Sequence, residues 1–395
     1  MRLIHTSDWH LGRSFHRVGL LDAQRRYLDD LVEVVRSEGV DAVLVSGDVY
    51  DRALPSPDTV ELLSYAVTRL IDAGAAVVLS SGNHDSAIRL GFASDLLSRA
   101  GLHIRTSLDQ VGAPVLIGDT AIYPLPYLEP SVAADRMGAS ERTHAAVLRA
   151  AMDRVRADAG TRRGTSVVMA HAFVTGGATS ESERDISVGG VSAVHPDVFA
   201  DADYVALGHL HGPQRISETV RYSGSPVALS FSEANHRKGS VLVDVTADGL
   251  TTELVPAPVA RSLAILRGDI EDLLRDPRHR SAESAWCQIT LTDSVRPMGA
   301  MDRLRRRFPD TLVLAFEPVG AQVIPHTTTA SVRQRGDLDL CCDFLTHVRA
   351  GNAASDPERA LLATAVESSR LVRGTREDEG RAAGDGRAAG ELGAA

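Results

Sequence analysis

The sequence predicts an α/β protein with a buried β-sheet in its N-terminal half and smaller units after it. Three observations support this prediction. Short β-rich apolar runs alternate with helical patterns over the first 210 residues, and strand-like runs then follow one another without helices. Near the C-terminus, two amphipathic stretches precede an end rich in Gly, Ala, Glu and Arg. With 395 residues, and about 150 residues per domain, the chain has room for two or three domains.

Five apolar runs are expected to form the strands of the first sheet. Apolar residues between Leu20 and Val35 recur at helical spacing after the first run, and Gly39 ends that helix. Between the second and third runs, Asp58 is expected to cap a helix that Gly74 closes. The five runs are Leu3–Ser7, Val40–Ser46, Ala75–Ser80, Ser166–Ala170 and Tyr204–Leu207.

The pattern changes after residue 210. Turn residues separate Val220–Ser223, Val227–Phe231 and Ser240–Val245, which predicts an antiparallel second sheet. Pro256 and Pro258 mark a boundary. Beyond it we expect strands at Leu263–Arg267, Trp286–Thr292 and Leu312–Phe316, and helices at Ile270–Arg275 and Met298–Phe308.

These patterns divide the chain into four parts. We expect a main domain over 1–255, a small α/β unit over 260–330, a helical segment over 336–373 and a disordered tail over 374–395. The helical segment contains two amphipathic helices, Asp337–Arg349 and Pro357–Val372. A helical pair this small cannot bury its own apolar faces, so it either packs on the body or binds a partner.

Composition excludes several classes of protein. The 42 basic and 52 acidic residues give a net charge of −10, which argues against a chain coated for nucleic acid. Lys238 is the one lysine and Gly239 follows it, so the chain has no Walker-type phosphate loop, which requires Gly-Lys-Ser/Thr. The three cysteines suit a reducing cytosol, and no apolar run approaches the roughly 18 residues of a membrane span. We therefore expect a soluble, cytoplasmic protein.

Each of the five N-terminal runs ends in residue types that bind metal ions. A single Asp or His after a strand is usually a turn or cap residue, but recurrence at five strand ends is hard to produce by turn chemistry. Because functional crevices lie at the carboxyl ends of such strands, we expect one shared rim. The residues are Asp8, His10, Asp48, Asn83, His84, Asp85, His171, His209 and His211.

Local features of these motifs bear on their geometry. Gly47, Gly82 and Gly208 each precede a candidate ligand, where a sharp turn lets the backbone approach closely. Residues two apart, such as Asp8 and His10, share a face if the strand continues and diverge if it gives way to a loop. The sequence leaves both options open.

The ligand types indicate two divalent cations. Carboxylate, carboxamide and imidazole without thiolate suit manganese, and iron or zinc less clearly. Two such ions about 3.5–4 Å apart can bind a phosphate and hold a hydroxide in line for attack at phosphorus. Asp8 and Asp48 supply two negative charges against four positive ones, so the site stays cationic and attracts a phosphodiester despite the net charge.

With these residues in order, the chain resembles the calcineurin-like metallophosphoesterases and, within them, the SbcD family of nuclease subunits. The resemblance is strong over residues 1–245 and weaker beyond. It implies a sandwich of two β-sheets flanked by helices, a small α/β capping domain and C-terminal helices. The narrower match rests on His5–Gly12, Ser46–Asp51, Ser180–Arg184, Ala206–His211 and Arg221–Pro226.

The resemblance also implies roles for individual residues. Asp8, His10 and His211 would bind one metal ion, Asn83, His171 and His209 the other, and Asp48 would bridge them. His84 would face the scissile phosphate, to stabilise its charge or protonate the leaving oxygen. Asp85 is expected to orient the His84 imidazole; Asp51 is either a similar support or a turn residue.

Two further features suggest partners. Arg303, Arg305, Arg306 and Arg307 form a basic cluster that either contacts phosphate backbones or is a solvated helix face. The C-terminal helical pair is expected, by resemblance, to dock on an SbcC-type ATPase, consistent with the missing Walker lysine.

As a whole, the resemblance implies that the protein is a Mn²⁺-dependent DNA nuclease subunit that acts in DNA repair and recombination. It would cut double-stranded ends as an exonuclease and hairpins as an endonuclease, in a heterotetramer built on a nuclease dimer. Two alternatives stay open: a metallophosphoesterase of small phosphomonoesters or cyclic nucleotides, and a non-catalytic scaffold that binds DNA ends.

Overall fold

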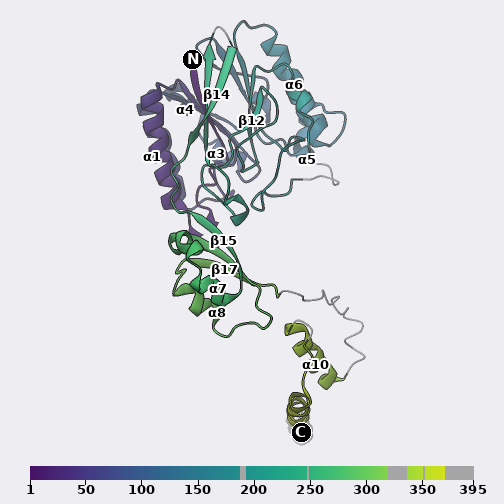
Figure 1. Ribbon diagram of the computed structural model, residues 1–395. Helices are drawn as coiled ribbons and strands as arrows, with labels where there is room; N and C mark the ends of the chain where they lie inside the picture. Colours follow the sequence, from purple (N-terminus) through teal and green to yellow (C-terminus); the bar gives the residue numbers. More distant parts are fainter. Residues whose placement is uncertain (187–192, 247–248, 319–335, 350–351, 370–395) are drawn as a thin grey trace, which may run out of the picture. The chain divides into compact units, whose positions relative to one another are not determined.

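The computed structural model describes residues 1–186, 193–246, 249–318, 336–349 and 352–369 (Figure 1). The chain separates into two compact units, Met1–Ala264 and Ile265–Ala395. The expected tail at 374–395 lies outside the described residues.

The first sheet of the N-terminal unit has six strands in the order β14-β13-β1-β4-β5-β6. Its centre is parallel, because crossovers lead from β1 to β4, from β4 to β5 and from β5 to β6. β13 pairs antiparallel with β1 and closes that side together with β14. The strands are β1 (Arg2–Thr6), β4 (Ala42–Ser46), β5 (Ala76–Ser80), β6 (Leu102–Arg105), β13 (Gly239–Thr246) and β14 (Gly249–Pro256).

The second sheet also has six strands, in the order β11-β12-β10-β9-β8-β7. β8, β9, β10 and β12 run parallel, and the short β7 and β11 are antiparallel edges. The strands are β7 (Val115–Ile117), β8 (Thr120–Pro124), β9 (Ser166–His171), β10 (Tyr204–Gly208), β11 (Gln214–Arg215) and β12 (Val220–Tyr222).

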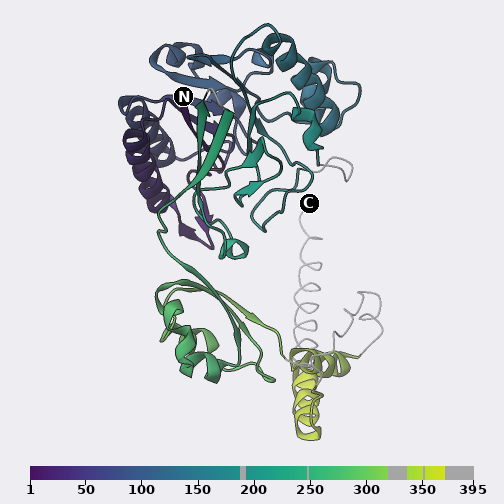
Figure 2. The same cartoon turned by 45° about the horizontal axis from the view of Figure 1, so that its top comes forward.

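The two sheets pack face to face and helices cover their outer faces, as Figures 1 and 2 show. Side chains from both sheets, such as Leu44 and Met169, form the core between them. A second core joins the first sheet to α1 (Leu21–Glu38) and α2 (Pro57–Asp72). A third joins the other sheet to α5 (Pro130–Met137) and α6 (His144–Ala159). The unit is therefore a four-layer sandwich, with β2 (Ser14–Phe15), β3 (Val18–Gly19), α3 (Ala87–Leu90) and α4 (Ser94–Leu97) in its connections.

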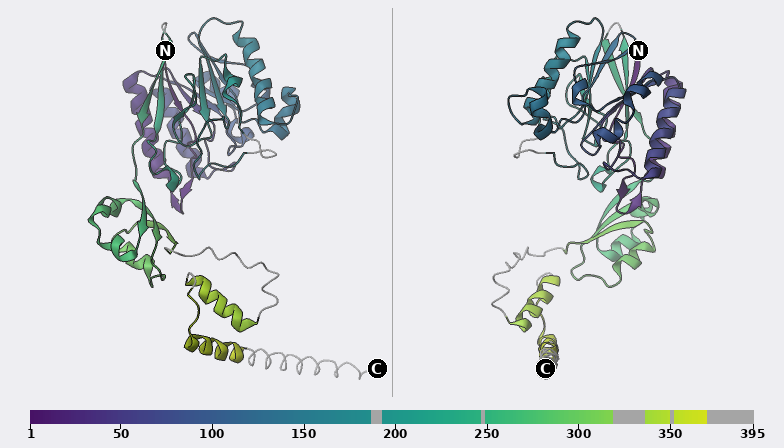
Figure 3. Two further views of the ribbon diagram at one scale, coloured as in Figure 1. Left: turned by 45° about the vertical axis from the view of Figure 1, so that its right-hand side comes forward. Right: turned by 180° about the vertical axis from the view of Figure 1, so that it is seen from behind.

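The C-terminal unit contains a three-stranded sheet in the order β15-β16-β17, with β16 and β17 parallel. Two further helices follow, α10 (Asp337–Val348) and a helix at 356–369; Figure 3 shows both from two more directions. The remaining elements are β15 (Leu263–Gly268), α7 (Ile270–Arg275), β16 (Trp286–Leu291), α8 (Ala300–Arg305) and β17 (Thr311–Phe316).

Three local predictions need correction. Ser56, not Asp58, is the N-cap of α2, because Pro57 takes the first helical position and Asp58 falls in the first turn. Residues 227–230 form no strand, and 231–233 form a 3₁₀ turn. The expected antiparallel second sheet does not form, because β13 pairs with β1 and β12 pairs parallel with β10.

A buried histidine between the sheets gives the fold a pH dependence. His5 Nε2 donates to the Leu207 carbonyl at 3.1 Å, and Nδ1 accepts from the Tyr204 hydroxyl at 2.9 Å. Burial lowers the pKa of His5 to about 3. The unfolded chain takes up a proton below its ordinary pKa of about 6.5 while the folded chain does not, so this group destabilises the fold as pH falls from 6.5 towards 3. The cost is up to about 1.4 kcal/mol per pH unit.

We therefore expect His5→Gln to flatten the acid side of the stability profile. Urea unfolding with EDTA present should give a constant difference in free energy of unfolding between wild type and variant above pH 6.5. Below that pH the wild type should lose stability relative to the variant. A difference independent of pH would contradict the prediction.

Candidate metal centre

Five strand ends deliver the candidate ligands to one place at the rim of the sandwich. β1, β4 and β5 belong to the first sheet, and β9 and β10 to the second. Hydrogen bonds tie the ends together across the sheets, since the His209 amide donates to both Asp8 carboxylate oxygens at 3.0 and 3.1 Å. The predicted shared rim is therefore built by two facing sheets.

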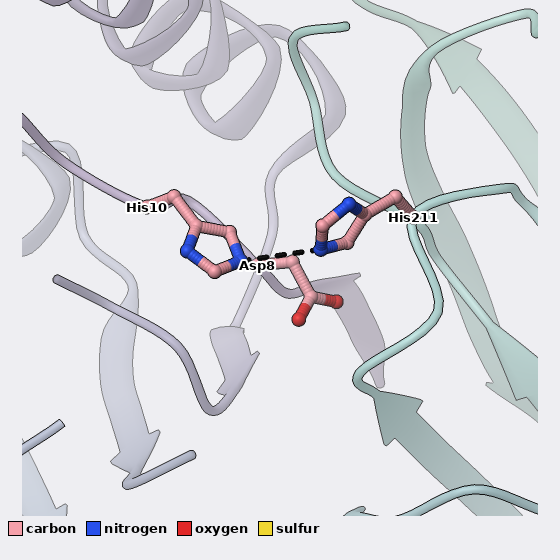
Figure 4. A group of neighbouring side chains, drawn as sticks. All are labelled: Asp8, His10 and His211. Carbon is pink, nitrogen blue, oxygen red and sulfur yellow. Dashed lines mark hydrogen bonds between the residues drawn. The ribbon is translucent and has the colours of Figure 1, made fainter. Parts of the chain in front are cut away.

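Asp8, His10 and His211 form the first group of ligand atoms (Figure 4). All three side chains are buried. Their ligand atoms lie within 4.8 Å of one another, and the Nε2 atoms of His10 and His211 are 3.2 Å apart. In Figure 4 the two imidazoles point towards each other beside the Asp8 carboxylate. Burial raises the pKa of Asp8 to about 6.

Asp48 lies at the centre of the site. Its Oδ2 is 3.4 Å from His171 Nε2, 3.5 Å from His10 Nε2 and 4.0 Å from His84 Nε2. Burial alone would raise the pKa of this carboxyl, but the surrounding imidazoles outweigh burial and hold it well below its usual range. Burial would likewise lower the pKa of His171, and the Asp48 carboxylate instead raises it to about 9.

A second set of ligand types lies on the other side of Asp48. His171 Nε2 is 2.9 Å from Asn83 Oδ1, and its Nδ1 is 3.0 Å from the Ser46 carbonyl. The His209 ring lies 5.4 Å from the His171 ring, centre to centre. Burial lowers the pKa of His209 to about 3, so this imidazole is neutral and free to bind through a nitrogen lone pair. Of the two residue pairs spaced two apart, Asp8 and His10 lie in the same ligand group. His209 lies beside His171, whereas His211 lies in the group of Asp8 and His10.

His84 lies beside both groups and is held by backbone. Its Nδ1 donates to the Asp51 carbonyl at 2.8 Å, and its amide donates to Asp48 Oδ1 at 2.8 Å. The His84 ring stands edge-on to that of His10, with centroids 4.6 Å apart. Burial lowers the pKa of His84 to about 4.

The expected role of Asp85 requires correction. Its carboxylate accepts hydrogen bonds from the backbone amides of Val49, Tyr50 and Gly82, at 2.9 to 3.1 Å, and thereby ties two ligand-bearing loops together. The support that we expected Asp85 to give the His84 ring comes from the Asp51 carbonyl. The Asp51 carboxylate lies 3.5 Å from His10 Nδ1 and 3.3 Å from an Arg13 guanidinium nitrogen.

Four of the candidate ligands have left-handed backbone conformations. The φ angles are 52° at Asp8, 42° at His10, 49° at Asp48 and 104° at His209. Such conformations are uncommon for residues other than glycine and cost of order 1–3 kcal/mol each. Strain of this kind persists only where the surrounding fold enforces it, and it concentrates at functional sites.

Two of the glycines that precede candidate ligands are required because atoms of other residues lie too close to them for a side chain. A Cβ on Gly208 would lie 1.9 Å from the Ser46 carbonyl oxygen. One on Gly82 would lie 2.2 Å from Asp48 Oδ1. Any side chain at either position would displace the loops that carry the ligands.

The arrangement fits divalent cations. Within the described residues, His10 Nε2 faces the Asp48 carboxylate at 3.5 Å and His211 Nε2 at 3.2 Å, and the Asn83 side-chain nitrogen is buried without a hydrogen-bond partner. Imidazole nitrogens and carboxylate oxygens of three overlapping groups face one another instead of the core: Asp8, His10 and His211; His10, Asp48 and His84; Asp8, Asp48 and His171. This donor set is consistent with two divalent metal ions.

The basic cluster of the C-terminal unit is partly engaged in structural contacts. Arg307 donates to Glu283 at 3.0 Å and to two backbone carbonyls at 2.8 Å, and Arg303 pairs with Glu271. Arg305 donates to the Thr311 carbonyl at 3.2 Å. Arg306 is exposed and, with Arg303 and Arg307, lines a cavity of about 640 Å³.

Sequence reasoning missed a buried network behind His211. Ser182 lies 2.5 Å from His211 Nδ1, Glu233 accepts from Ser182, and Lys238 pairs with Glu233. The rarity of lysine and the motif at Ser180–Arg184 were the available signals.

In the part of the chain that the structure describes, no helix is long and apolar enough to cross a membrane.

Comparison with known proteins identifies the class. The family model for calcineurin-like phosphoesterases matches residues 1–213, more than half of the chain, and the chain belongs to this family. It is therefore a metallophosphoesterase, a hydrolase. A second family model, described as the type 5 capsule protein repressor C-terminal domain, matches residues 259–349.

One relative is similar along almost the whole chain. The SbcD subunit of the nuclease SbcCD from Staphylococcus saprophyticus subsp. saprophyticus is 28% identical over 369 residues, which cover 91% of this chain and 96% of that protein. The resemblance to SbcD is thereby confirmed. Among solved structures, TT1561 of Thermus thermophilus has a TM-score of 0.38 at 14% identity, with 64% of this chain and 98% of that chain covered. A dimetal phosphatase from Danio rerio also has a TM-score of 0.38 at 14% identity, with 66% and 97% covered.

Proposed function

We propose that the chain is the metal-dependent DNA nuclease subunit of an SbcCD-type complex, located in the cytoplasm and acting in DNA repair and recombination. It would hydrolyse phosphodiesters as an exonuclease on duplex ends and as an endonuclease on hairpins. The observation that carries this proposal is the convergence of seven ligand-type side chains from two sheets, six of them buried, with His84 beside them.

The protein's own residues divide the work. Asp8, His10 and His211 would hold one ion, Asn83, His171 and His209 the other, with the Asp48 carboxylate between them. When bound, two divalent ions, most favourably Mn²⁺, supply positive charge to the phosphate oxygens and lower the pKa of an attacking water. His84 is fixed through Nδ1 by the Asp51 carbonyl, and its Nε2 would act on the phosphate, either by protonating the leaving oxygen or by stabilising the charge at phosphorus.

Two rivals share the fold. A phosphatase of small monoesters or cyclic nucleotides would use the same ligands, but it would not need the C-terminal unit that the SbcCD relative shares. A scaffold without catalysis would have no use for four strained ligand backbones.

A cleavage assay separates these functions. The full chain, with and without an SbcC-type ATPase, is incubated with end-labelled duplex and hairpin DNA in Mn²⁺, beside Asp48→Ala and His84→Ala variants. We expect the wild type to cleave DNA and both variants to cleave it far more slowly. Absence of cleavage, or equal cleavage by the variants, would overturn the proposal, and turnover of p-nitrophenyl phosphate without DNA cleavage would favour the phosphatase.

The basic cluster gives a prediction about DNA contact. Arg306 is exposed, whereas Arg307 is held by Glu283 and two carbonyls. We expect Arg306→Ala to weaken DNA binding and to reduce the slope of log affinity against log salt by about 1, with an unchanged melting temperature. Arg307→Ala should instead lower the melting temperature. Equal DNA affinity of wild type and Arg306→Ala in salt titrations would place the contact elsewhere.

The helical segment would dock on the ATPase, in a heterotetramer built on a nuclease dimer. Phe344 and Leu361 support this, because their side chains are 65% and 76% exposed. Co-purification of the ATPase with wild type, and its loss with Phe344→Asp and Leu361→Asp, would check the contact; the mass of the complex in solution would check the stoichiometry.

A further inference from the structure

We infer that Ser182, Glu233 and Lys238 are positioning residues that fix the metal-binding tautomer of His211. The inference rests on the proposed metal centre and extends it to residues outside the ligand set. It follows from which of these atoms can donate a hydrogen bond and which can only accept one.

The serine between His211 and Glu233 determines the direction of the chain of hydrogen bonds. Ser182 Oγ lies 2.5 Å from His211 Nδ1 and also contacts Glu233 Oε1. Ser180 Oγ also lies 2.9 Å from Ser182 Oγ, but it gives its own proton to Glu183. An ionised carboxylate only accepts and is a stronger acceptor than a hydroxyl, so the one hydroxyl proton of Ser182 is directed to Glu233. The serine oxygen must then accept from His211, which places the ring proton on Nδ1. His211 Nε2 is left with its lone pair on the side of His10 and Asp8.

Lys238 stabilises the ionised form of the Glu233 carboxyl. The Glu233 side chain is fully buried and pairs with the Lys238 ammonium, and an unpaired charge at this depth would cost several kcal/mol. Lys238 Nζ also donates to the His211 carbonyl at 2.7 Å and to Ser225 Oγ at 2.9 Å. The lysine therefore holds the backbone of His211 directly and its ring through Glu233 and Ser182.

The chemistry of the ammonium explains why a lysine occupies this position. Three acceptors surround Nζ, namely Glu233 Oε2, the His211 carbonyl and Ser225 Oγ. A compact ammonium has three rotatable donors around one atom, whereas the donors of arginine form a planar fork. In a chain whose other 41 Lys and Arg residues are all arginine, the single lysine lies where three acceptors surround one nitrogen, an arrangement that matches an ammonium better than a guanidinium.

The segment that carries Ser182 holds the histidine a second time. Glu183 Oε1 accepts from the His211 amide at 2.8 Å, so neighbouring residues bind the ring and the backbone of the same ligand. Metal-binding histidines generally donate their second nitrogen to a carboxylate or carbonyl. Here a serine relays that contact to a buried carboxylate.

The decisive comparison is Ser182→Ala against Ser230→Ala. Ser230 Oγ donates to the same Glu233 oxygen at 3.0 Å but lies off the path to His211, so it is the matched control. We expect calorimetric titration of the full chain with Mn²⁺ to show two ions bound by the wild type. In Ser182→Ala one of these sites should lose ten- to hundredfold in affinity, while Ser230→Ala stays within about twofold of wild type by the same principle.

A second measurement reads the tautomer itself. Long-range ¹H–¹⁵N NMR of ¹⁵N-histidine-labelled chain in EDTA, assigned with His211→Gln, should show the Nδ1–H form of His211 in wild type and a mixture in Ser182→Ala. Lys238→Arg, which keeps the charge, should shift the same signal. The wild-type spectrum alone is decisive if a variant fails to fold, because an Nε2–H form of His211 overturns the inference.

The outcomes also separate this inference from the proposed function. Unchanged Mn²⁺ affinities in Ser182→Ala, or equal losses in Ser182→Ala and Ser230→Ala, would overturn the positioning role and leave the metal centre intact. A wild-type chain that binds no Mn²⁺ would overturn the metal centre and this inference together.

Discussion

Replacing Asp48 with asparagine is expected to abolish DNA cleavage, with a loss of roughly 10³-fold or more. The carboxylate lies within 4.0 Å of three imidazoles that belong to the two proposed ion sites or lie beside them. An amide of the same shape provides one neutral oxygen in place of a shared charge. Calorimetric titration with Mn²⁺ should therefore show weakened binding of both ions, in contrast to Ser182→Ala, which should affect one.

The same variant has a stability signature that does not depend on activity. The pKa of Asp48 lies below its unfolded value, so its contribution is present above about pH 4 and is lost as pH falls. The pKa of His171 is raised to about 9, so its contribution is complete below about pH 6.5 and is lost as pH rises through 9. In EDTA, Asp48→Asn should lower the melting temperature more at pH 5.5 than at pH 9.5. Equal losses at both pH values would contradict this electrostatic account.

Local patterns in the sequence were sufficient for the parts of the fold that depend on them. β1, β4, β5, β9 and β10 lie where five apolar runs predicted strands, since continuous apolar runs are typical of strands buried on both faces. Gly39 ends α1, as predicted, and the structure shows that it does so in the left-handed conformation. The pairing of β13 with β1 could not be predicted in this way, because it joins residues about 240 positions apart.

The same distinction between local patterns and tertiary contacts holds for the candidate site. The ligands could be predicted because each follows a strand end in a short motif, as Asp48 follows Gly47. The hydrogen-bond partners of those ligands could not be predicted, because tertiary contacts determine them. Asp85 bonds to backbone amides on another loop, and Glu233 reaches His211 through a serine 51 residues away in the chain. Such contacts leave no periodic signal in the sequence.

Replacing His84 with alanine is expected to reduce DNA cleavage by about 10²- to 10⁴-fold while two Mn²⁺ ions still bind. The two effects separate because His84 lies outside the proposed ligand set and is held by the Asp51 carbonyl. Since that carbonyl only accepts, Nδ1 carries the proton of the neutral ring. Nε2 can then donate only as an imidazolium, which burial disfavours by lowering the pKa to about 4 in the metal-free chain.

The leaving group decides which role His84 performs. A nucleotide p-nitrophenyl phosphodiester has a leaving oxygen that needs no proton, whereas the sugar oxygen of DNA needs one. If His84 protonates the leaving oxygen, His84→Ala should cleave the p-nitrophenyl diester nearly as fast as wild type, while its rate of DNA cleavage should fall strongly. If His84 instead stabilises charge on phosphorus, both substrates should lose equally. Asp48→Asn is the control, because loss of the ions slows cleavage of both substrates in either case. If His84→Ala cleaves DNA at the wild-type rate, His84 takes no part in the reaction.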